Sequence, residues 1–245
     1  MSLQDYYEDV FKSERGRSTS DLMEESVRTS KGLFNFACEM KDKFLSNKDW
    51  KDLKVLELGS GRGGLSLSLA RLGAQVTLVD FSPSALQQAV QIFAQEGLPV
   101  ITIEGDVTYP DLDIPLKFDL IIDSHLLHCL AFDPQRSSYY SLVKDHLNEG
   151  GVFLAETMVH RKKLFIPEGF MLDQNNVLWQ MIGQWKPVRK IIDSIDLENE
   201  LKNSGFNITY FYYYAQYVFV PHKSFLDLPE DILPASVRFA VQIKN

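Results

Sequence analysis

The chain reads VLELGSGRGG over residues 55–64 and VTLVD over residues 76–80, with a short helical pattern between the two segments. The first segment is a mostly apolar run that ends in a glycine-rich loop, and the second is an apolar run that ends at Asp80. Glycines let a backbone approach a ligand closely, and the helix after such a loop presents N–H groups. A carboxylate at the end of the next strand can accept both hydroxyl protons of a ribose. This order of strand, loop, helix, strand and acid predicts a nucleoside site.

The glycine loop alone does not identify the nucleotide. Gly59, Gly61 and Gly64 also fit the dinucleotide pattern G-x-G-x-x-G, which is a weak signal by itself. The context strengthens the signal, because Asp80 follows the loop by about twenty residues, the separation expected of a ribose ligand. A nicotinamide dinucleotide and S-adenosylmethionine both remain candidates from the loop. The plain alternative is a tight strand-to-helix turn that binds no ligand.

The glycine loop and four later segments occur in a fixed order along the chain. They are the loop with its acid (Glu57, Gly59, Gly61 and Gly63), an acid after the second strand (Asp80), an acid after the third strand (Asp106), FDLIID at 118–123 and LNEGGVFL at 147–154. In this order and at this spacing they resemble the class I, Rossmann-like S-adenosylmethionine-dependent methyltransferases of the small-molecule type. The resemblance is detailed over residues 50–160, and over residues 190–245 it is one of layout.

The resemblance implies S-adenosyl-L-methionine as the cofactor. It implies that the cofactor is bound by Glu57, Gly59, Ser60, Gly61, Gly63, Asp80, Phe81, Asp106, Val107 and Asp123. Asp80 would bind the ribose hydroxyls, and Asp106 would accept a hydrogen bond from the adenine amino group beside Val107. Glu57 would orient the loop or the cofactor's amine. Asp106 has a plain alternative as an ordinary loop acid, since Asp is common in turns.

The candidate catalytic residues are the histidines of the stretch DSHLLHC, residues 123–129. Methyl transfer needs a base only if the acceptor holds a proton that must leave. His128 is our first candidate for that base and His125 the second, because histidine titrates near neutral pH. Either could instead be structural. The paired acids of metal-dependent catechol enzymes are missing after the fifth strand, so we expect no required metal.

An α/β fold is expected from the alternation of elements. Strands are predicted at 54–58, 75–80, 100–104, 118–123 and 152–155, and helices at 65–72, 84–96 and 137–147. Apolar strands alternating with helices predict a doubly wound parallel sheet. A helix at 197–204, capped by Asp196, precedes strand-like runs near 208–220 and 236–243. We therefore expect a Rossmann-like, seven-stranded mixed sheet whose last strand is antiparallel.

A single domain of 245 residues is expected to contain all of these parts. Residues 1–50 read as a helical leader or cap, with a second helix starting at Asp21, and residues 51–157 as the cofactor-binding core. Residues 158–190 read as an aromatic insertion that is either a lid over the substrate or a small surface subdomain. Residues 191–245 hold the C-terminal helix and strand pair. We expect the leader to pack over the cofactor cleft or on the sheet edge.

Composition limits the partners. The net charge is −8, whereas proteins that bind nucleic acid present basic surfaces, so no nucleic-acid partner is expected. The sequence holds no apolar run of membrane-spanning length, and Cys38 and Cys129 have no metal spacing. Because residues 1–7 are polar and acidic, we expect no secretory signal. We expect a cytoplasmic monomer or homodimer without a membrane partner. One basic run, residues 160–163 with Lys186, Arg189 and Lys190, is either solvated surface or a local site for an acidic substrate.

These observations predict a methyltransferase that acts on an oxygen or nitrogen of a small-molecule acceptor. The aromatic residues of the insertion favour a planar or partly apolar acceptor. Three alternatives stay open: a protein methyltransferase, a non-catalytic scaffold or sensor that binds S-adenosylmethionine, and a nicotinamide reductase. The last is disfavoured by the long leader and the terminal strand pair.

Overall fold

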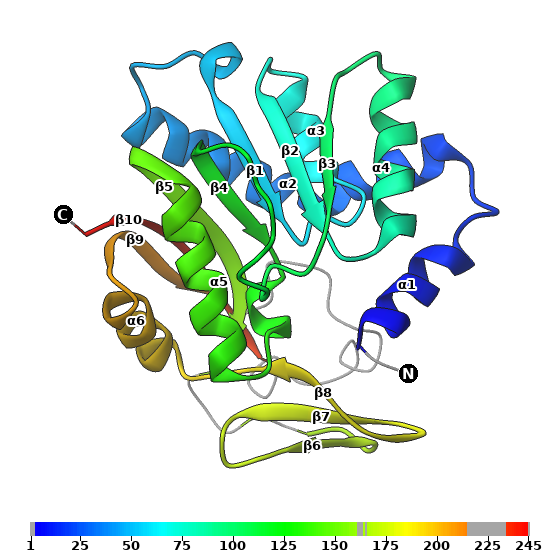
Figure 1. Ribbon diagram of the computed structural model, residues 1–245. Coiled ribbons are helices and arrows are strands. Elements are labelled where there is room, and N and C mark those ends of the chain that lie inside the picture. The colour runs from blue at the N-terminus through cyan, green and yellow to red at the C-terminus, as the bar shows by residue number, and fades with distance from the viewer. Residues whose placement is uncertain (1–2, 161–163, 165, 215–233, 245) are drawn as a thin grey trace.

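The computed structural model describes residues 3–160, 164, 166–214 and 234–244 (Figure 1). Seven strands form one sheet in the order β3-β2-β1-β4-β5-β10-β9. They are β1 (Lys54–Leu58), β2 (Gln75–Asp80), β3 (Ile101–Glu104), β4 (Phe118–Ser124), β5 (Leu147–Val159), β9 (Phe206–Tyr214) and β10 (Ala235–Ile243). The strands from β3 to β5 are parallel, whereas β10 runs antiparallel to both β5 and β9. The predicted seven-stranded mixed sheet with an antiparallel last strand is confirmed.

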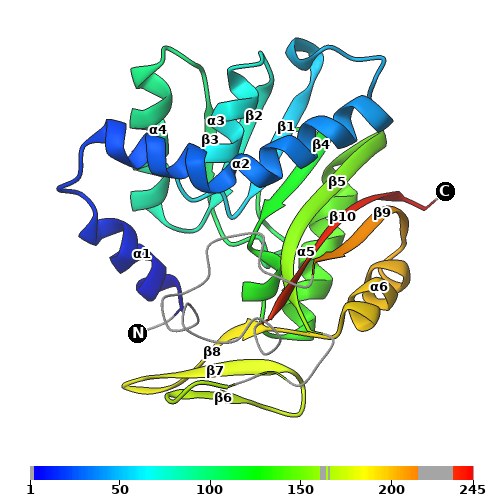
Figure 2. The same cartoon turned by 180° about the vertical axis from the view of Figure 1, so that it is seen from behind.

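Helices cover both faces of this sheet. They are α1 (Leu3–Ser13), α2 (Thr19–Phe44), α3 (Gly64–Ala70), α4 (Pro83–Gln95), α5 (Asp133–His146) and α6 (Ser194–Asn203), with the short 3-10 turns η1 (Trp50–Asp52) and η2 (Leu127–Cys129). α5 lies in front of the sheet in Figure 1, and α2 crosses the opposite face in Figure 2. Successive side chains of β4 point to opposite faces of the sheet. Ile121 packs in the hydrophobic cluster that includes α5, while Leu120 and Ile122 pack in the cluster that includes α2 and α3. The sheet is therefore buried on both sides, as apolar parallel strands require.

Two predicted helix caps are wrong. α2 begins at Thr19 rather than at Asp21, because the hydroxyl of Ser18 accepts the Asp21 N–H at 3.1 Å and caps the helix. α6 begins at Ser194, because the carboxylate of Asp193, not Asp196, accepts an N–H of the first turn. In both places several cap-forming residues are close together in the sequence, and the pattern alone selected the wrong one.

Two elements are longer than predicted. α5 begins at Asp133 rather than at residue 137, because the side chain of Gln135 accepts the N–H of Phe132 and closes the first turn. β5 extends from Leu147 to Val159, so it reaches beyond its parallel neighbour β4. The predicted strand at 208–220 begins at Phe206, and its residues 215–220 lie outside the described residues.

The insertion forms a second, three-stranded antiparallel sheet. Its strands are β6 (Phe170–Leu172), β7 (Val177–Ile182) and β8 (Gln184–Lys190). Leu178, Val188 and Ile191 form a small core with Met158 of β5, which fixes this sheet beyond the end of β5. Figure 1 shows it together with α1 beyond the carboxyl ends of the parallel strands. Among the described residues, no helix is both long and apolar enough to cross a membrane.

Candidate active site

A cavity of about 400 Å³ lies at the carboxyl ends of β1, β2 and β4. In open α/β sheets this is the edge where ligands bind. The lining comes from separate segments: the glycine loop (Gly59 and Gly61), the end of β2 (Asp80 and Phe81), the turn after β3 (Asp106 and Val107), the segment after β4 (His125 and His128), helix α1 (Tyr7 and Phe11) and strand β8 (Arg189). The cavity therefore brings together most of the residues predicted for the site. Its volume is within the size range of small-molecule pockets.

The glycine loop follows β1 and turns sharply over the cavity. Gly59 and Gly61 have φ values of +64° and +52°, which side chains rarely adopt. The N–H of Gly61 donates to Asp80 Oδ2 at 2.8 Å, so the loop and the end of β2 are joined directly. Gly63 differs from its prediction, because it is buried against Leu78 rather than lining the cavity.

A second hollow of about 420 Å³ lies behind the loop, between α1, α2 and the residues Glu57 and Ser60. Glu57 is buried and accepts the Ser66 N–H at 3.2 Å. Burial raises the pKa of Glu57 to about 7. The Ser60 hydroxyl is buried without a hydrogen-bond partner among the described residues. These polar groups beside the loop suit the polar end of a ligand that the loop would hold.

The two acids beside the cavity are held by backbone donors. Asp80 accepts N–H groups from Gly61 and from Ser82, the latter at 2.9 Å, while burial raises its pKa. Thr108 donates both its N–H and its hydroxyl to Oδ1 of Asp106. Oδ2 of Asp106 has no donor among the described residues, which leaves it available to a ligand. The predicted helix start after Asp80 is confirmed, since the Ser82 hydroxyl caps α4.

Helix α1 covers one side of the cavity. The Tyr7 hydroxyl lies 3.6 Å from the sulfur of Cys129, and the Tyr7 ring packs edge-on against Phe81. Gln4 donates to the carbonyl of Phe81 at 3.3 Å. The N-terminal helix thus lines the cavity with side chains from its inner face.

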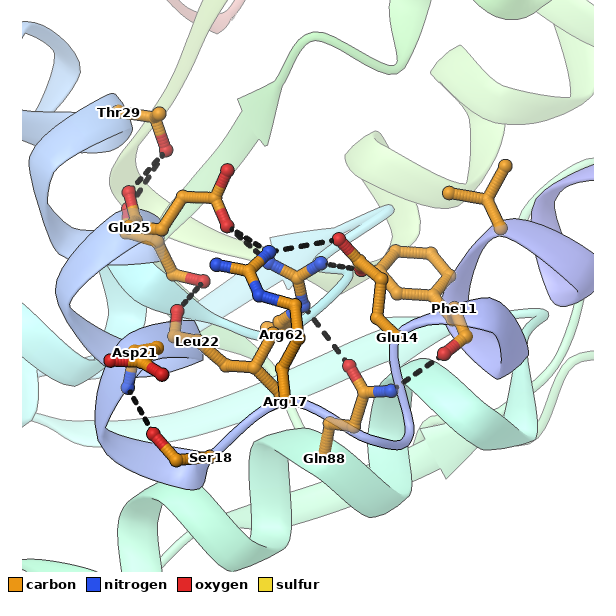
Figure 3. A network of polar contacts seen from close by, with 12 residues as sticks. Phe11, Glu14, Arg17, Ser18, Asp21, Leu22, Glu25, Thr29, Arg62 and Gln88 are labelled. Atoms are coloured by element: carbon orange, nitrogen blue, oxygen red, sulfur yellow. Dashed lines mark hydrogen bonds and ion pairs between the residues drawn. The ribbon is translucent and has the colours of Figure 1, made fainter.

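An arginine of the glycine loop holds the chain between α1 and α2 in place. Figure 3 shows Arg62 bound to carboxylates of Glu14 and Glu25 and to the amide oxygen of Gln88. The Arg62 guanidinium also lies over the ring of Phe11, 5.5 Å from its centroid. We name Arg62, Glu14, Glu25, Gln88 and Phe11 the Arg62 cluster. It ties the glycine loop to α1, the helix that covers the cavity.

Glu8 makes the second attachment of α1. Its carboxylate accepts the hydroxyls of Ser82 and Ser84, each at 2.6 Å, at the N-terminus of α4. Burial alone would raise the pKa of Glu8, but these hydrogen bonds and Lys12 lower it to about 2. A carboxylate at a helix N-terminus also gains from the helix dipole. Glu8 therefore anchors α1 as an ionised group.

His125 begins the segment after β4. Its backbone φ is +78°, an uncommon value for a residue with a side chain and one that gathers at functional sites. Nε2 of His125 lies 2.6 Å from Oε1 of Glu156, and Oε2 of Glu156 binds Arg238. Burial raises the pKa of Glu156, but the hydrogen bonds and charges of His125 and Arg238 outweigh it and lower the pKa overall. An ionised glutamate therefore orients the imidazole.

His128 also lines the cavity but is buried more deeply. Its Nδ1 accepts the N–H of Met158 at 3.4 Å and lies 3.3 Å from the hydroxyl of Thr157. Burial lowers the pKa of His128 well below its usual value, and the nearby basic side chains of Arg189, His125 and Arg136 lower it further. His128 is thus a neutral imidazole whose basic nitrogen is used by the backbone.

Asp123 lies beneath the cavity and is fully buried. It accepts the Tyr139 hydroxyl and the Leu126 N–H, both at 2.6 Å, and burial raises its pKa to about 6. The structure gives Asp123 a role in holding the turn that carries His125, where we had expected a contact with cofactor or acceptor.

Sequence reasoning missed Tyr7 and Glu156 as site residues, and it left Arg189 open between solvated surface and a local site for an acidic substrate. Tyr7 and Arg189 reach the cavity from segments outside the Rossmann pattern, so the methyltransferase motifs did not mark them. The tryptophans of the insertion, which we expected over the substrate, do not line the cavity. Trp179 instead donates to Asp173, and Trp185 is 42% exposed. Phe165 of the same insertion lies outside the described residues. The insertion contributes its arginine rather than its tryptophans.

Known proteins are similar to this chain in sequence. Ubiquinone biosynthesis O-methyltransferase of Proteus mirabilis is 31% identical over 110 residues, 45% of this chain and 44% of that protein. Human EEF1A lysine methyltransferase 2 is 29% identical over 131 residues, 49% of this chain and 55% of that protein. The chain spans about half the length of the curated relatives that it matches.

Solved structures share the fold. A crystal structure of an S-adenosylmethionine-dependent methyltransferase from Clostridium acetobutylicum aligns with a TM-score of 0.58 at 18% identity, covering 87% of this chain and 100% of that one. The glycopeptide N-methyltransferase MtfA complexed with S-adenosyl-L-homocysteine aligns with a TM-score of 0.56 at 17% identity, covering 83% and 88%. These neighbours confirm the predicted Rossmann-like fold.

The family model of the methyltransferase domain matches residues 49–212, from the turn before β1 to β9. This range is more than half of the chain and includes the glycine loop, both cavity acids and the two histidines. The resemblance to class I methyltransferases is confirmed at the level of the family. The chain belongs to the methyltransferase domain family.

Proposed function

We propose that this protein binds S-adenosylmethionine and transfers its methyl group to an oxygen or nitrogen of a small-molecule acceptor. The observation that carries this proposal is one cavity that Asp80, Asp106 and His125 all line at the carboxyl ends of the strands. The first two supply carboxylates for a nucleoside, and the third supplies an oriented base.

The residues present fit the cofactor. Asp80 would accept the ribose hydroxyls, and Oδ2 of Asp106 would accept from the adenine amino group, with Phe81 and Val107 beside the ring. The buried Ser60 hydroxyl and the Glu57 carboxyl lie behind the loop, where the amino-acid end of the cofactor would need polar partners. When bound, S-adenosylmethionine supplies a methyl group on a positively charged sulfur.

His125 suits the role of general base better than His128. If Nε2 of His125 carries the proton shared with Glu156, then Nδ1 is the basic nitrogen of that tautomer. This nitrogen would take the acceptor's proton, and Glu156 would stabilise the charged ring that results. His128 has its basic nitrogen bound to the Met158 N–H and a pKa held low by burial, which leaves it a weak base.

A small acceptor is favoured by what surrounds the cavity. Tyr7 and Phe11 of α1 line one side and Arg189 of β8 another. A protein substrate would have to bring its backbone between these segments, whereas a small molecule needs only a short opening. Such cover also excludes water from the reacting groups.

Transfer of radiolabelled methyl groups tests the proposal. The protein is incubated with labelled S-adenosylmethionine and either a metabolite extract freed of macromolecules or a mixture of denatured and native proteins. Label in the small-molecule fraction, lost with His125→Asn, supports the proposal. Label in protein alone would favour the second candidate, a protein methyltransferase, for which the similarity to EEF1A lysine methyltransferase 2 is the argument. Cofactor binding without any transfer would indicate a scaffold or sensor.

A further inference from the structure

Arg189 brings a permanent positive charge to the cavity. It lies on β8 of the three-stranded sheet, opposite Leu178 of β7. Among the described residues that line the cavity, it is the one lysine or arginine side chain. The protein as a whole has a net charge of −8, so a positive charge at this place is not a general property of its surface.

The position of Arg189 is on the acceptor side of the cavity. Asp80 and Asp106 follow β2 and β3, at one end of the sheet order, whereas β8 packs against η2, which follows β4. Met158, at the end of β5, lines the same half of the cavity. The nucleoside and the arginine therefore have separate halves of the cavity, with His125 on the segment between β4 and η2.

The charge of Arg189 acts on groups in the cavity wall. It opposes the rise in pKa that Cys129 and burial impose on Tyr7, and the rise that burial imposes on the Cys129 thiol. It also adds to the lowering of the pKa of His128 that burial causes. At each of these three side chains the guanidinium favours the more negative form.

The neighbouring lysine serves a different purpose. Lys190 forms an ion pair with Asp133 at the start of α5 and so attaches β8 to the main domain. Lys190 and the apolar contacts of Val188 fix strand β8. Because Arg189 lies between these two residues, its backbone is held beside the cavity. Residues 161–163 of the basic run lie outside the described residues.

We propose that Arg189 binds a carboxylate of the acceptor, and that the acceptors of this enzyme are therefore small carboxylic acids methylated at another oxygen or at a nitrogen. A guanidinium presents two parallel N–H groups that match a carboxylate, and it keeps its charge when partly buried. The apolar lining beside it, Leu126, Leu130 and Met158, suits the carbon skeleton of such an acid. This inference rests on the proposed function and adds the chemical class of the acceptor.

Matched pairs of probes test this inference on the full chain saturated with S-adenosylhomocysteine. Benzoate is compared with benzamide, and phenylacetate with phenylacetamide, by ligand-observed NMR titration. Each pair has the same shape and differs in charge. We expect each acid to bind at least about tenfold more tightly than its amide, because only the acid pairs with the guanidinium.

Variants of β8 assign the difference to one side chain. Arg189→Gln should remove the preference for acids and leave amide binding within about twofold, and Arg189→Lys should restore part of it. Lys186→Gln removes a positive charge from the same strand away from the cavity and should change nothing. Equal binding of acids and amides to the wild type, absence of acid binding, or a preference that survives in Arg189→Gln would each overturn the inference.

The outcome is separable from that of the proposed function. S-adenosylhomocysteine affinity and the thermal midpoint are measured for each variant, so that a misfolded Arg189→Gln is recognised and Arg189→Lys decides in its place. If the wild type binds no S-adenosylhomocysteine, the proposed function fails. The acid and amide comparison without cofactor then still decides whether Arg189 selects anions.

Discussion

Nε2 of His125 lies 2.6 Å from Oε1 of Glu156, although 31 positions separate the two residues in the chain. The register of the sheet explains the contact, because Ser124 at the end of β4 lies opposite Glu156 in β5. The position of β5 that pairs with the last residue of β4 therefore supplies the carboxylate that orients the first side chain after β4. The pairing of two parallel strands positions the base that the proposed reaction uses.

Substitution of this pair should separate chemistry from binding. His125→Asn removes the base and should lower kcat by about 10²–10⁴-fold for an acceptor that loses a proton, with the affinity for S-adenosylmethionine nearly unchanged. Glu156→Gln should lower kcat less, since the imidazole remains and only its orientation is lost. Glu149→Gln, an exposed change on the same strand, is the control and should have wild-type kcat. A wild-type kcat in His125→Asn would contradict the assignment.

The attachment of α1 should govern cofactor affinity. Glu8→Gln removes the charge that holds α1 at the N-terminus of α4, so α1 should cover the cavity less of the time and cofactor affinity should fall severalfold. Asp9→Asn changes an exposed acid one position along the same helix and should have no effect. Calorimetric titration with S-adenosylhomocysteine measures both. Equal affinities in the two variants would show that the attachment of α1 does not contribute.

The close packing of Gly63 beneath the glycine loop should be visible in the free energy of unfolding of an alanine variant. A Cβ on Gly63 would lie 2.7 Å from a methyl group of Leu78, and the φ of +68° is unfavourable for alanine. Gly97 has nearly the same φ, +67°, but nothing within 4 Å of such a Cβ. Gly97→Ala should therefore cost only the backbone strain, about 1–2 kcal/mol, and Gly63→Ala should cost a further 1–3 kcal/mol or so from overpacking. Urea unfolding measures both, and equal losses would contradict the packing described for Gly63.

The buried Glu57 predicts a pH dependence of stability. Its pKa rises from an ordinary 4.5 to about 7 in the folded state, so the folded protein binds this proton more tightly than the unfolded chain does. The tighter binding of this proton stabilises the folded state by up to about 3 kcal/mol. This stabilisation is fully present below pH 4.5 and is lost as the pH rises through about 7. Glu57→Gln cannot lose a proton there. The free energy of unfolding of this variant, relative to wild type, should increase between pH 5 and pH 8, and a constant difference would contradict the raised pKa.

The sequence was sufficient for the central sheet and for the two acids that line the cavity. Short apolar strands and a glycine loop are local patterns, so β1 and β2 were predicted with their observed bounds, and Asp80 and Asp106 line the cavity as expected. The helix starts at Ser18 and Asp193 were missed because neighbouring polar residues competed for the cap. Glu156 was missed and Arg189 was left undecided, because their places at the cavity depend on strand register and on the placement of the insertion. Both are tertiary relationships that no local pattern encodes.

The central claim is that the glycine loop and its acids bind S-adenosylmethionine. Calorimetric titration of the wild type, Asp80→Asn and Glu104→Gln with S-adenosylmethionine tests it most directly. Glu104 is the matched control, because it pairs with Asp80 across β2 and β3 but is exposed and outside the cavity lining. The account predicts tight binding by the wild type and by Glu104→Gln, and a loss of about 1–3 kcal/mol in Asp80→Asn. No binding by folded wild-type protein, or equal binding by all three, would contradict it.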